Sequence, residues 1–132
     1  MGIETLAPGL NGELEMEVTE EVTARHIGSG ALRVFATPAM VLLVERACTG
    51  LVQPHLAQGQ SSVGVSIRLR HLAPTPLGQR VRARVEVVAV EERLLTFKAE
   101  VWDDREQVGE GEHQRAVIDV ERFLRRVQAK SE

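Results

Sequence analysis

The 132-residue sequence is poor in the features that would assign it to several common classes of protein. It has one cysteine, Cys48, so an intramolecular disulfide is impossible and a CxxC metal site is absent. Its longest apolar run, Ala39–Val44, is far too short to span a bilayer. The segment Met1–Gly12 has no basic stretch followed by an apolar core, so it is not a signal peptide. We therefore expect a cytoplasmic protein with no membrane partner.

Catalytic and binding motifs of the common kinds are also missing. The sequence contains no glycine-rich phosphate loop, no HExxH and no GxSxG. The net charge of −3 gives no electrostatic reason to expect nucleic acid as a partner. Arginine outnumbers lysine 14 to 2, which suits phosphate binding but also results from a codon bias. We expect no metal and no cofactor.

Apolar and polar residues alternate with a period of two in five places, which predicts five strands with one wet face each. One strand lies before residue 20. Three more follow residue 60, and a fifth runs from Val108 to Val120, weakened or bulged near Gly109 and Gly111. The apolar positions of the first four strands are Leu14, Met16, Val18; Val63, Val65, Ile67, Leu69; Val81, Ala83, Val85, Val87, Ala89; and Leu95, Phe97, Ala99, Val101.

One long helix is predicted between these strands. Thr37 is a good N-cap, and Pro38 is tolerated at the first helical position, so the helix runs from Pro38 to about Val52 and stops before Pro54. The body of this helix is apolar on every side, which predicts that other structure surrounds it. His26–Gly30 is predicted to be a loop, and Glu121–Lys130 a short amphipathic helix.

Together these elements are one strand, one buried helix and a four-stranded antiparallel meander. An antiparallel sheet wrapped around one central apolar helix, with a short C-terminal helix, is the α+β hot-dog fold. The length predicts a single domain over residues 1–132. No alternating βαβ units occur, which disfavours a doubly wound nucleotide-binding fold.

Two polar residues interrupt the apolar pattern. Glu45 directly follows the seven-residue stretch Pro38–Val44, which has no polar side chain, so Glu45 is either partly buried or already at the exposed end of the helix. His71 is in phase with Ile67 and Leu69, so its imidazole points from the apolar face toward the helix. The imidazole in that position has one of two roles: a structural hydrogen bond to a backbone carbonyl group, or catalysis.

Thr37 has a second potential role beside capping, because free N–H groups at a helix N-terminus stabilise a developing oxyanion. Along one helix, however, Thr37 and Glu45 are about 12 Å apart. A site shared across a two-fold dimer would resolve this, with one chain supplying the helix end and its partner the carboxylate. Other candidates are weaker: His113 is expected at the surface or a sheet edge, His26 and His55 in loops, and Cys48 in the core.

The sequence resembles the fluoroacetyl-CoA thioesterase family of hot-dog proteins. The similarity rests on Val34-Phe35-Ala36-Thr37, Met40-Val41 and Glu45-x-Ala47-Cys48, on Gly64 before a strand ending in His71, and on Gly111 to Ile118 with His113 and Arg115-Ala116-Val117. It spans roughly residues 34–123. The resemblance implies an acyl-CoA thioesterase whose catalytic residues are Thr37, Glu45 and His71, with Gly64 and Arg115 lining the substrate pocket.

The family's fluoroacetyl-specific enzyme carries phenylalanines as a lid before the helix, whereas His26–Arg33 here has no aromatic residue. We therefore expect a different short or medium acyl group, bound between the subunits of a homodimer or a tetramer. Glu45 would act as general base or as nucleophile. Arg68, Arg70, Arg82 and Arg84 either contact CoA phosphates or form solvated strand faces, and we favour the second.

Two rival functions remain at this point. One is a non-catalytic module on the same fold that binds acyl-CoA. The other is a hydratase, which is less favoured because such enzymes use an Asp–His pair and no aspartate precedes Asp103.

Overall fold

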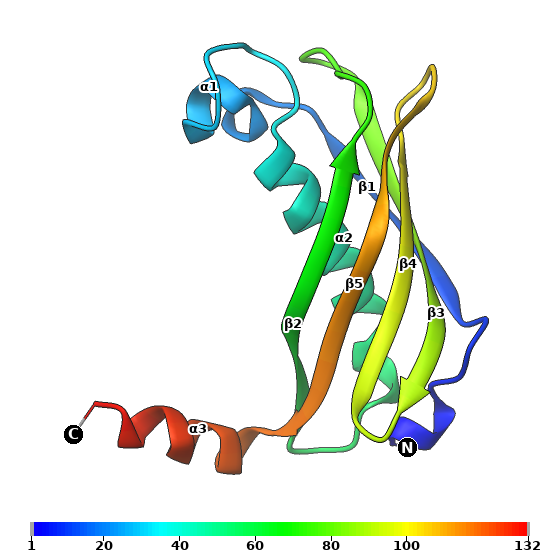
Figure 1. Cartoon of the computed structure of the whole chain (residues 1–132), viewed down its shortest axis with the longest axis vertical. Coiled ribbons are helices and arrows are strands. Elements are labelled where there is room, and N and C mark those ends of the chain that lie inside the picture. Colours follow the sequence, from blue (N-terminus) through cyan, green and yellow to red (C-terminus); the bar gives the residue numbers. More distant parts are fainter. Residues whose placement is uncertain (1, 132) are drawn as a thin grey trace.

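A five-stranded antiparallel sheet packs against one long helix in the computed structural model, which describes residues 2–131 (Figure 1). The strands are β1 (Asn11–Glu17), β2 (Gln60–His71), β3 (Arg80–Glu91), β4 (Leu94–Trp102) and β5 (Gln107–Asp119), and the long helix is α2 (Thr37–Val52). The predicted hot-dog architecture, with its central helix and short C-terminal helix α3 (Val120–Ala129), is confirmed.

The strand order is β1-β3-β4-β5-β2, which corrects the predicted four-stranded meander. Only β3, β4 and β5 are consecutive neighbours, and β2 pairs with β5 at the far edge. A two-residue turn in which Glu92 has φ 58° joins β3 to β4. The connection from β2 to β3 is longer and contains Pro74 and Pro76. It carries the chain from β2, at one edge of the sheet, past β5 and β4 to β3. β2 is therefore an edge strand.

One face of α2 forms the centre of the core. Its fully buried residues pack over the inward side chains of β3 and β4; they are Ala39, Met40, Leu43, Val44, Ala47, Cys48 and Val52. The opposite face is open in the single chain, because Leu42 is 39% exposed and Val41 is half-buried. The prediction that α2 is surrounded on every side is therefore wrong for one chain, since the sheet covers the helix from one side.

A bulge in β2 changes which of its residues face α2. The pairing with β5 shifts between Gly64 and Ser66, so Gly64 lies opposite Arg115 and Ile67 opposite His113. The two β5 residues are buried, so Gly64 and Ile67 face inward, whereas Val65 is 55% exposed. The prediction that every second side chain from Val63 to His71 faces the helix is therefore wrong at Val63 and Val65. A second shift, between Val87 and Ala89, moves Ala89 out of the buried row of β3.

The N-terminal part of the predicted loop His26–Gly30 is helical. The helix α1 (Ala24–Ile27) starts with the Thr23 hydroxyl accepting a hydrogen bond from the His26 N–H and stops at Gly28, whose φ is 92°. Three single 3₁₀ turns, η1 (Ile3–Thr5), η2 (Glu20–Val22) and η3 (Gln53–His55), complete the elements.

The glycines of β5 serve close packing and not a break in the strand. Gly109 and Gly111 keep regular pairing with β2, but the register with β4 shifts beside Gly109: Val101 lies opposite Gly109 and Trp102 opposite Gln107, so Val108 is an extra residue of β5. A Cβ atom on Gly109 would come within 2.5 Å of the Met40 sulfur, which is fully buried. The predicted bulge near Gly109 is therefore confirmed, whereas Gly111 lies in regular pairing.

We predict that Gly109→Ala lowers the free energy of unfolding by about 1–3 kcal/mol, because the fully buried Met40 side chain must shift to make room for the new methyl group. Gly50→Ala is the matched control: Gly50 is exposed on α2, and a Cβ atom there meets nothing within 4 Å. This control should stabilise the protein by about 0.8–1 kcal/mol through helix propensity. Denaturant unfolding measures both, and equal stability of Gly109→Ala and the wild type would contradict this account of the packing.

Candidate active site

A threonine–histidine pair lies where α2 begins and β2 ends. The Thr37 Oγ1 and His71 Nδ1 atoms are 2.7 Å apart and share a hydrogen bond. The Phe35 ring meets the imidazole edge-on, with 6.2 Å between ring centroids. Thr37 is the first residue of α2 and Ala36 is the N-cap, so the predicted capping role of Thr37 is wrong. Its hydroxyl binds the imidazole instead.

The His71 imidazole has one ring nitrogen to spare. Its Nε2 atom is buried and has no hydrogen-bond partner among residues 2–131. Burial is the main effect that lowers the pKa of His71 below 6.5, so the ring is neutral at pH 7. An unpartnered buried nitrogen is costly, and in a neutral imidazole it donates or accepts one hydrogen bond according to the tautomer.

An open cavity of about 380 Å³ adjoins this pair. Thr37, His71 and Phe35 line it together with small and apolar residues of the preceding loop and of the chain after β2, namely Ala24, Ser29, Val34, Leu72, Ala73 and Pro74. Its volume is in the range of small-molecule sites. Phe35 is the only aromatic residue in its lining.

Glu45 belongs to a second polar cluster, two turns further along α2. Its side chain is 39% exposed, and its Oε2 atom lies 3.9 Å from Nη1 of Arg115. A Cβ atom on Gly64 would stand 3.0 Å from the same carboxylate oxygen, so the carboxylate lies directly against the Gly64 backbone. The structure therefore brings together Glu45, Gly64 and Arg115, but it does not bring Glu45 to the Thr37–His71 pair within one chain.

Arg115 is held by hydrogen bonds on the side away from Glu45. Its Nε donates to the Ser62 hydroxyl at 2.9 Å, and Nη2 donates to the Ser62 carbonyl at 3.0 Å. Its Nη1 lies 3.2 Å from Nε2 of His113. At 3.9 Å from the carboxylate, the guanidinium is too far for a direct hydrogen bond, so the Glu45 oxygens stay free for another donor.

His113 is the functional-site residue that the sequence prediction misplaced. It is 1% exposed, stacks on Phe97, and donates from Nδ1 to the Ser66 carbonyl at 2.8 Å. Burial is the main effect that lowers its pKa below 6.5, so neutral Nε2 accepts from Arg115. His113 alternates with Arg115 and Val117 along β5, which places the three side chains on the same face of the sheet. Gly109 and Gly111 hide this alternation in the sequence.

Cys48 is buried in the core, and burial raises its thiol pKa to about 12, so it is not a nucleophile. No group of three or more His, Cys, Asp or Glu side chains in the described part of the chain is arranged to hold a metal ion. Within residues 2–131 no helix combines the length and the hydropathy that crossing a membrane requires.

Comparison with known proteins gives consistent matches over most of the chain. Residues 18–121 match the family model of the fluoroacetyl-CoA-specific thioesterase FlK. The fluoroacetyl-CoA thioesterase of Streptantibioticus cattleyicolor is 40% identical over 98 residues, which cover 74% of this chain and 70% of that protein.

Two solved structures extend these matches to three dimensions. A crystal structure of the fluoroacetyl-CoA thioesterase FlK is 34% identical and superposes with a TM-score of 0.88 over 95% of this chain and 97% of that one. A hot-dog-like protein from Thermanaerovibrio acidaminovorans is 25% identical, with a TM-score of 0.90 over 97% and 95% of the two chains.

The two buried histidines predict how stability depends on pH. Because folding lowers their pKa, the unfolded chain takes up protons near pH 6.5 that the folded chain does not, so the free energy of unfolding falls as the pH drops below about 6.5. We expect His113→Gln to reduce this fall between pH 7.5 and pH 5. Denaturant unfolding at both pH values measures it, and an unchanged pH dependence in the variant would show that His113 is not the titrating group.

Proposed function

Because the chain belongs to the fluoroacetyl-CoA-specific thioesterase family, we propose that it hydrolyses a short or medium acyl-CoA to the free acid and CoA. The observation that carries the proposal is the Thr37–His71 pair, which lines an open cavity and whose neutral imidazole keeps a buried Nε2 without a partner. A catalytic hydrogen bond to substrate or water would satisfy that atom.

In this mechanism the thioester carbonyl lies near the first turn of α2, where backbone N–H groups without helical partners stabilise negative charge. Glu45 either takes a proton from the attacking water or attacks the carbonyl carbon itself. The carbon–sulfur bond then breaks, and His71 relays to the CoA thiolate the proton that the attacking water gives up; in the nucleophilic route that water hydrolyses the Glu45–acyl anhydride and so releases the acid. Thr37 orients the imidazole through its 2.7 Å hydrogen bond.

We propose that two chains form each site in a homodimer. The edge strand β2 has unpaired backbone groups along one side, and Val65 on it and Leu42 on α2 are exposed apolar residues. Antiparallel pairing of two β2 strands about a two-fold axis would bring Gly64 of one strand toward the His71 end of the other. Glu45 of one subunit would then approach the partner's His71.

The acyl group is proposed from the lining of the 380 Å³ cavity. Residues 26–33 contribute no aromatic side chain, so nothing there matches the phenylalanine lid of the fluoroacetyl-specific enzyme. An open apolar wall accepts a longer chain than a fluoroacetyl group, which supports a short or medium acyl substrate. No cofactor is needed, because CoA is part of the substrate.

We expect Glu45→Ala and His71→Ala each to lower acyl-CoA hydrolysis a hundredfold or more, on the usual scale for acid–base groups. Release of free thiol across a panel of acyl-CoA chain lengths measures this. His55→Ala is the matched control, because His55 Nδ1 also lies 2.7 Å from a threonine hydroxyl, that of Thr5, but outside the site. Binding of acyl-CoA without thiol release would instead support the non-catalytic module.

Mixing the two inactive variants tests whether the site is shared. Random reassociation of Glu45→Ala and His71→Ala chains makes half of the dimers mixed, and each mixed dimer has one intact site if the residues come from different chains. We therefore expect roughly a quarter of wild-type activity to return. If both residues act within one chain, mixing restores nothing, and the shared site is wrong.

A further inference from the structure

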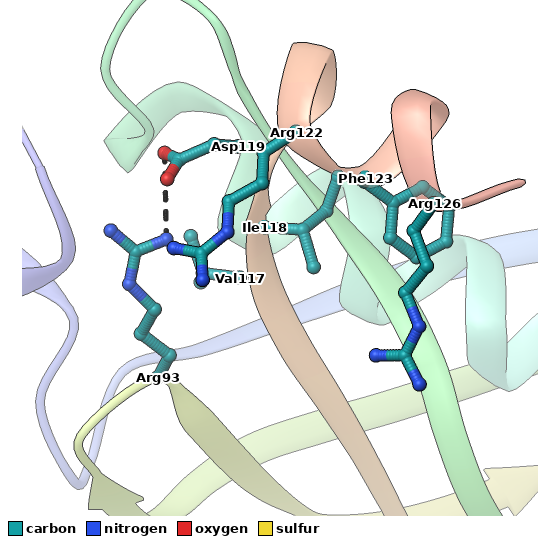
Figure 2. Close-up of a pocket in the computed structure, with 7 residues that line it drawn as sticks. All are labelled: Arg93, Val117, Ile118, Asp119, Arg122, Phe123 and Arg126. Atoms are coloured by element: carbon teal, nitrogen blue, oxygen red, sulfur yellow. Dashed lines mark ion pairs between the residues drawn. The ribbon is translucent and has the colours of Figure 1, made fainter. Parts of the chain in front are cut away.

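A groove lined by arginines lies where α3 leaves the sheet (Figure 2). Its cavity is about 470 Å³, and Arg93 from the β3–β4 turn reaches it from one side while Arg122 and Arg126 reach it from α3. Phe123 and Ile118 supply apolar walls. A second cavity of about 420 Å³ continues past Phe123 and Arg126 toward Lys130.

The acidic residues around the groove do not balance its positive charge. Arg93 lies 3.5 Å from Asp119, the one acidic residue in the lining of either cavity. Arg122 and Arg126 are four residues apart, so they project from the same side of α3. Neither has an ion-pair partner within residues 2–131. In a chain of net charge −3, such a local excess of guanidinium groups favours an anionic ligand.

The strand arginines considered above differ from this group. Arg82 and Arg84 both lie near Glu13, at 3.6 and 3.7 Å, and Arg70 lies 3.3 Å from Glu110. These arginines are exposed and have carboxylate partners on neighbouring strands. Arg68, like Arg122 and Arg126, has no ion-pair partner within residues 2–131, but Glu100 and Glu110 line the same cavity as Arg68, whereas Asp119 is the one acidic residue that lines the α3 groove.

We propose that the α3 groove binds the phosphate groups of the CoA thioester, with the half-buried Phe123 against the adenine ring. This inference rests on the proposed thioesterase function. Guanidinium forks bind phosphate oxygens in pairs, and aromatic rings stack on bases. The groove thus combines the two kinds of group that a phosphorylated adenosine needs.

The position of the groove fits the shape of the ligand. A CoA ester carries its phosphates and adenine at the far end of the pantetheine arm, so their site must lie away from the thioester. Val117 lines the groove two residues along β5 from Arg115, which faces Glu45, and this spacing is about 7 Å along a strand. The groove therefore begins near the carboxylate end of the proposed site without overlapping it.

Substrates that differ only in their phosphates test the proposal. We expect the double variant Arg122→Gln/Arg126→Gln to raise KM for the best acyl-CoA of the panel about tenfold, the scale of one charged hydrogen bond, with kcat unchanged. KM for the matching acyl-pantetheine, which lacks the phosphates, should not change. Arg125→Gln is the control, because Arg125 pairs with Glu121 at 3.4 Å outside the groove and should leave both KM values unchanged.

Calorimetric titration with CoA gives a readout independent of turnover, and its Kd should rise by the same factor in the double variant. An unchanged KM and Kd, or an equal rise in KM for acyl-pantetheine, would overturn the proposal. If the double variant weakens only an acyl substrate carried by an acidic carrier protein, the groove serves that protein and the CoA assignment is wrong. Failure of the wild type to release thiol from any substrate refutes the thioesterase function, whereas CoA binding still tests the groove.

Discussion

The spacing of Thr37 and Glu45 on one rigid helix sets the arrangement of the whole candidate site. Eight residues of α2 separate them by about 12 Å, and the buried face of α2 fixes the helix against β3 and β4, so neither end moves without unpacking the core. β2 runs beside α2, so the start and the middle of the helix each have a strand partner: His71 for Thr37 and Gly64 for Glu45. Chemistry that needs both positions therefore needs a second copy of the chain.

The cluster around Arg115 is rigid before any substrate arrives. A buried guanidinium must be hydrogen-bonded, and Ser62 and His113 satisfy the groups that do not face Glu45. His113 can accept from Arg115 only while it is neutral, and its bond to the Ser66 carbonyl fixes the tautomer that does so. The carboxylate of Glu45 thus faces a positive charge of fixed position, although it is itself partly open to solvent.

The sequence was sufficient for features that depend on local periodicity. The apolar run after Thr37 predicted α2, and alternation predicted β1, β3 and β4 nearly residue by residue. Features that depend on the change of register in β2 were not predictable. One extra residue at the β2 bulge turns Gly64 inward and Val65 outward, and the pairing of β2 with β5 decides that His113 is buried. Nothing in the alternation of β2 alone reveals either effect.

The charge pattern of α3 is not explained by folding of this chain. A ten-residue helix is marginal by itself, and α3 extends away from the sheet with only Val120 and Phe123 half-buried (Figure 1). The Glu121–Arg125 pair supports the helix, but Arg122 and Arg126 place two like charges four residues apart, which disfavours a helix by a few tenths of a kcal/mol. A bound anion between the two guanidinium groups removes that repulsion. Occupancy of the groove and the stability of α3 are then linked, because a ligand that binds only the folded helix stabilises it.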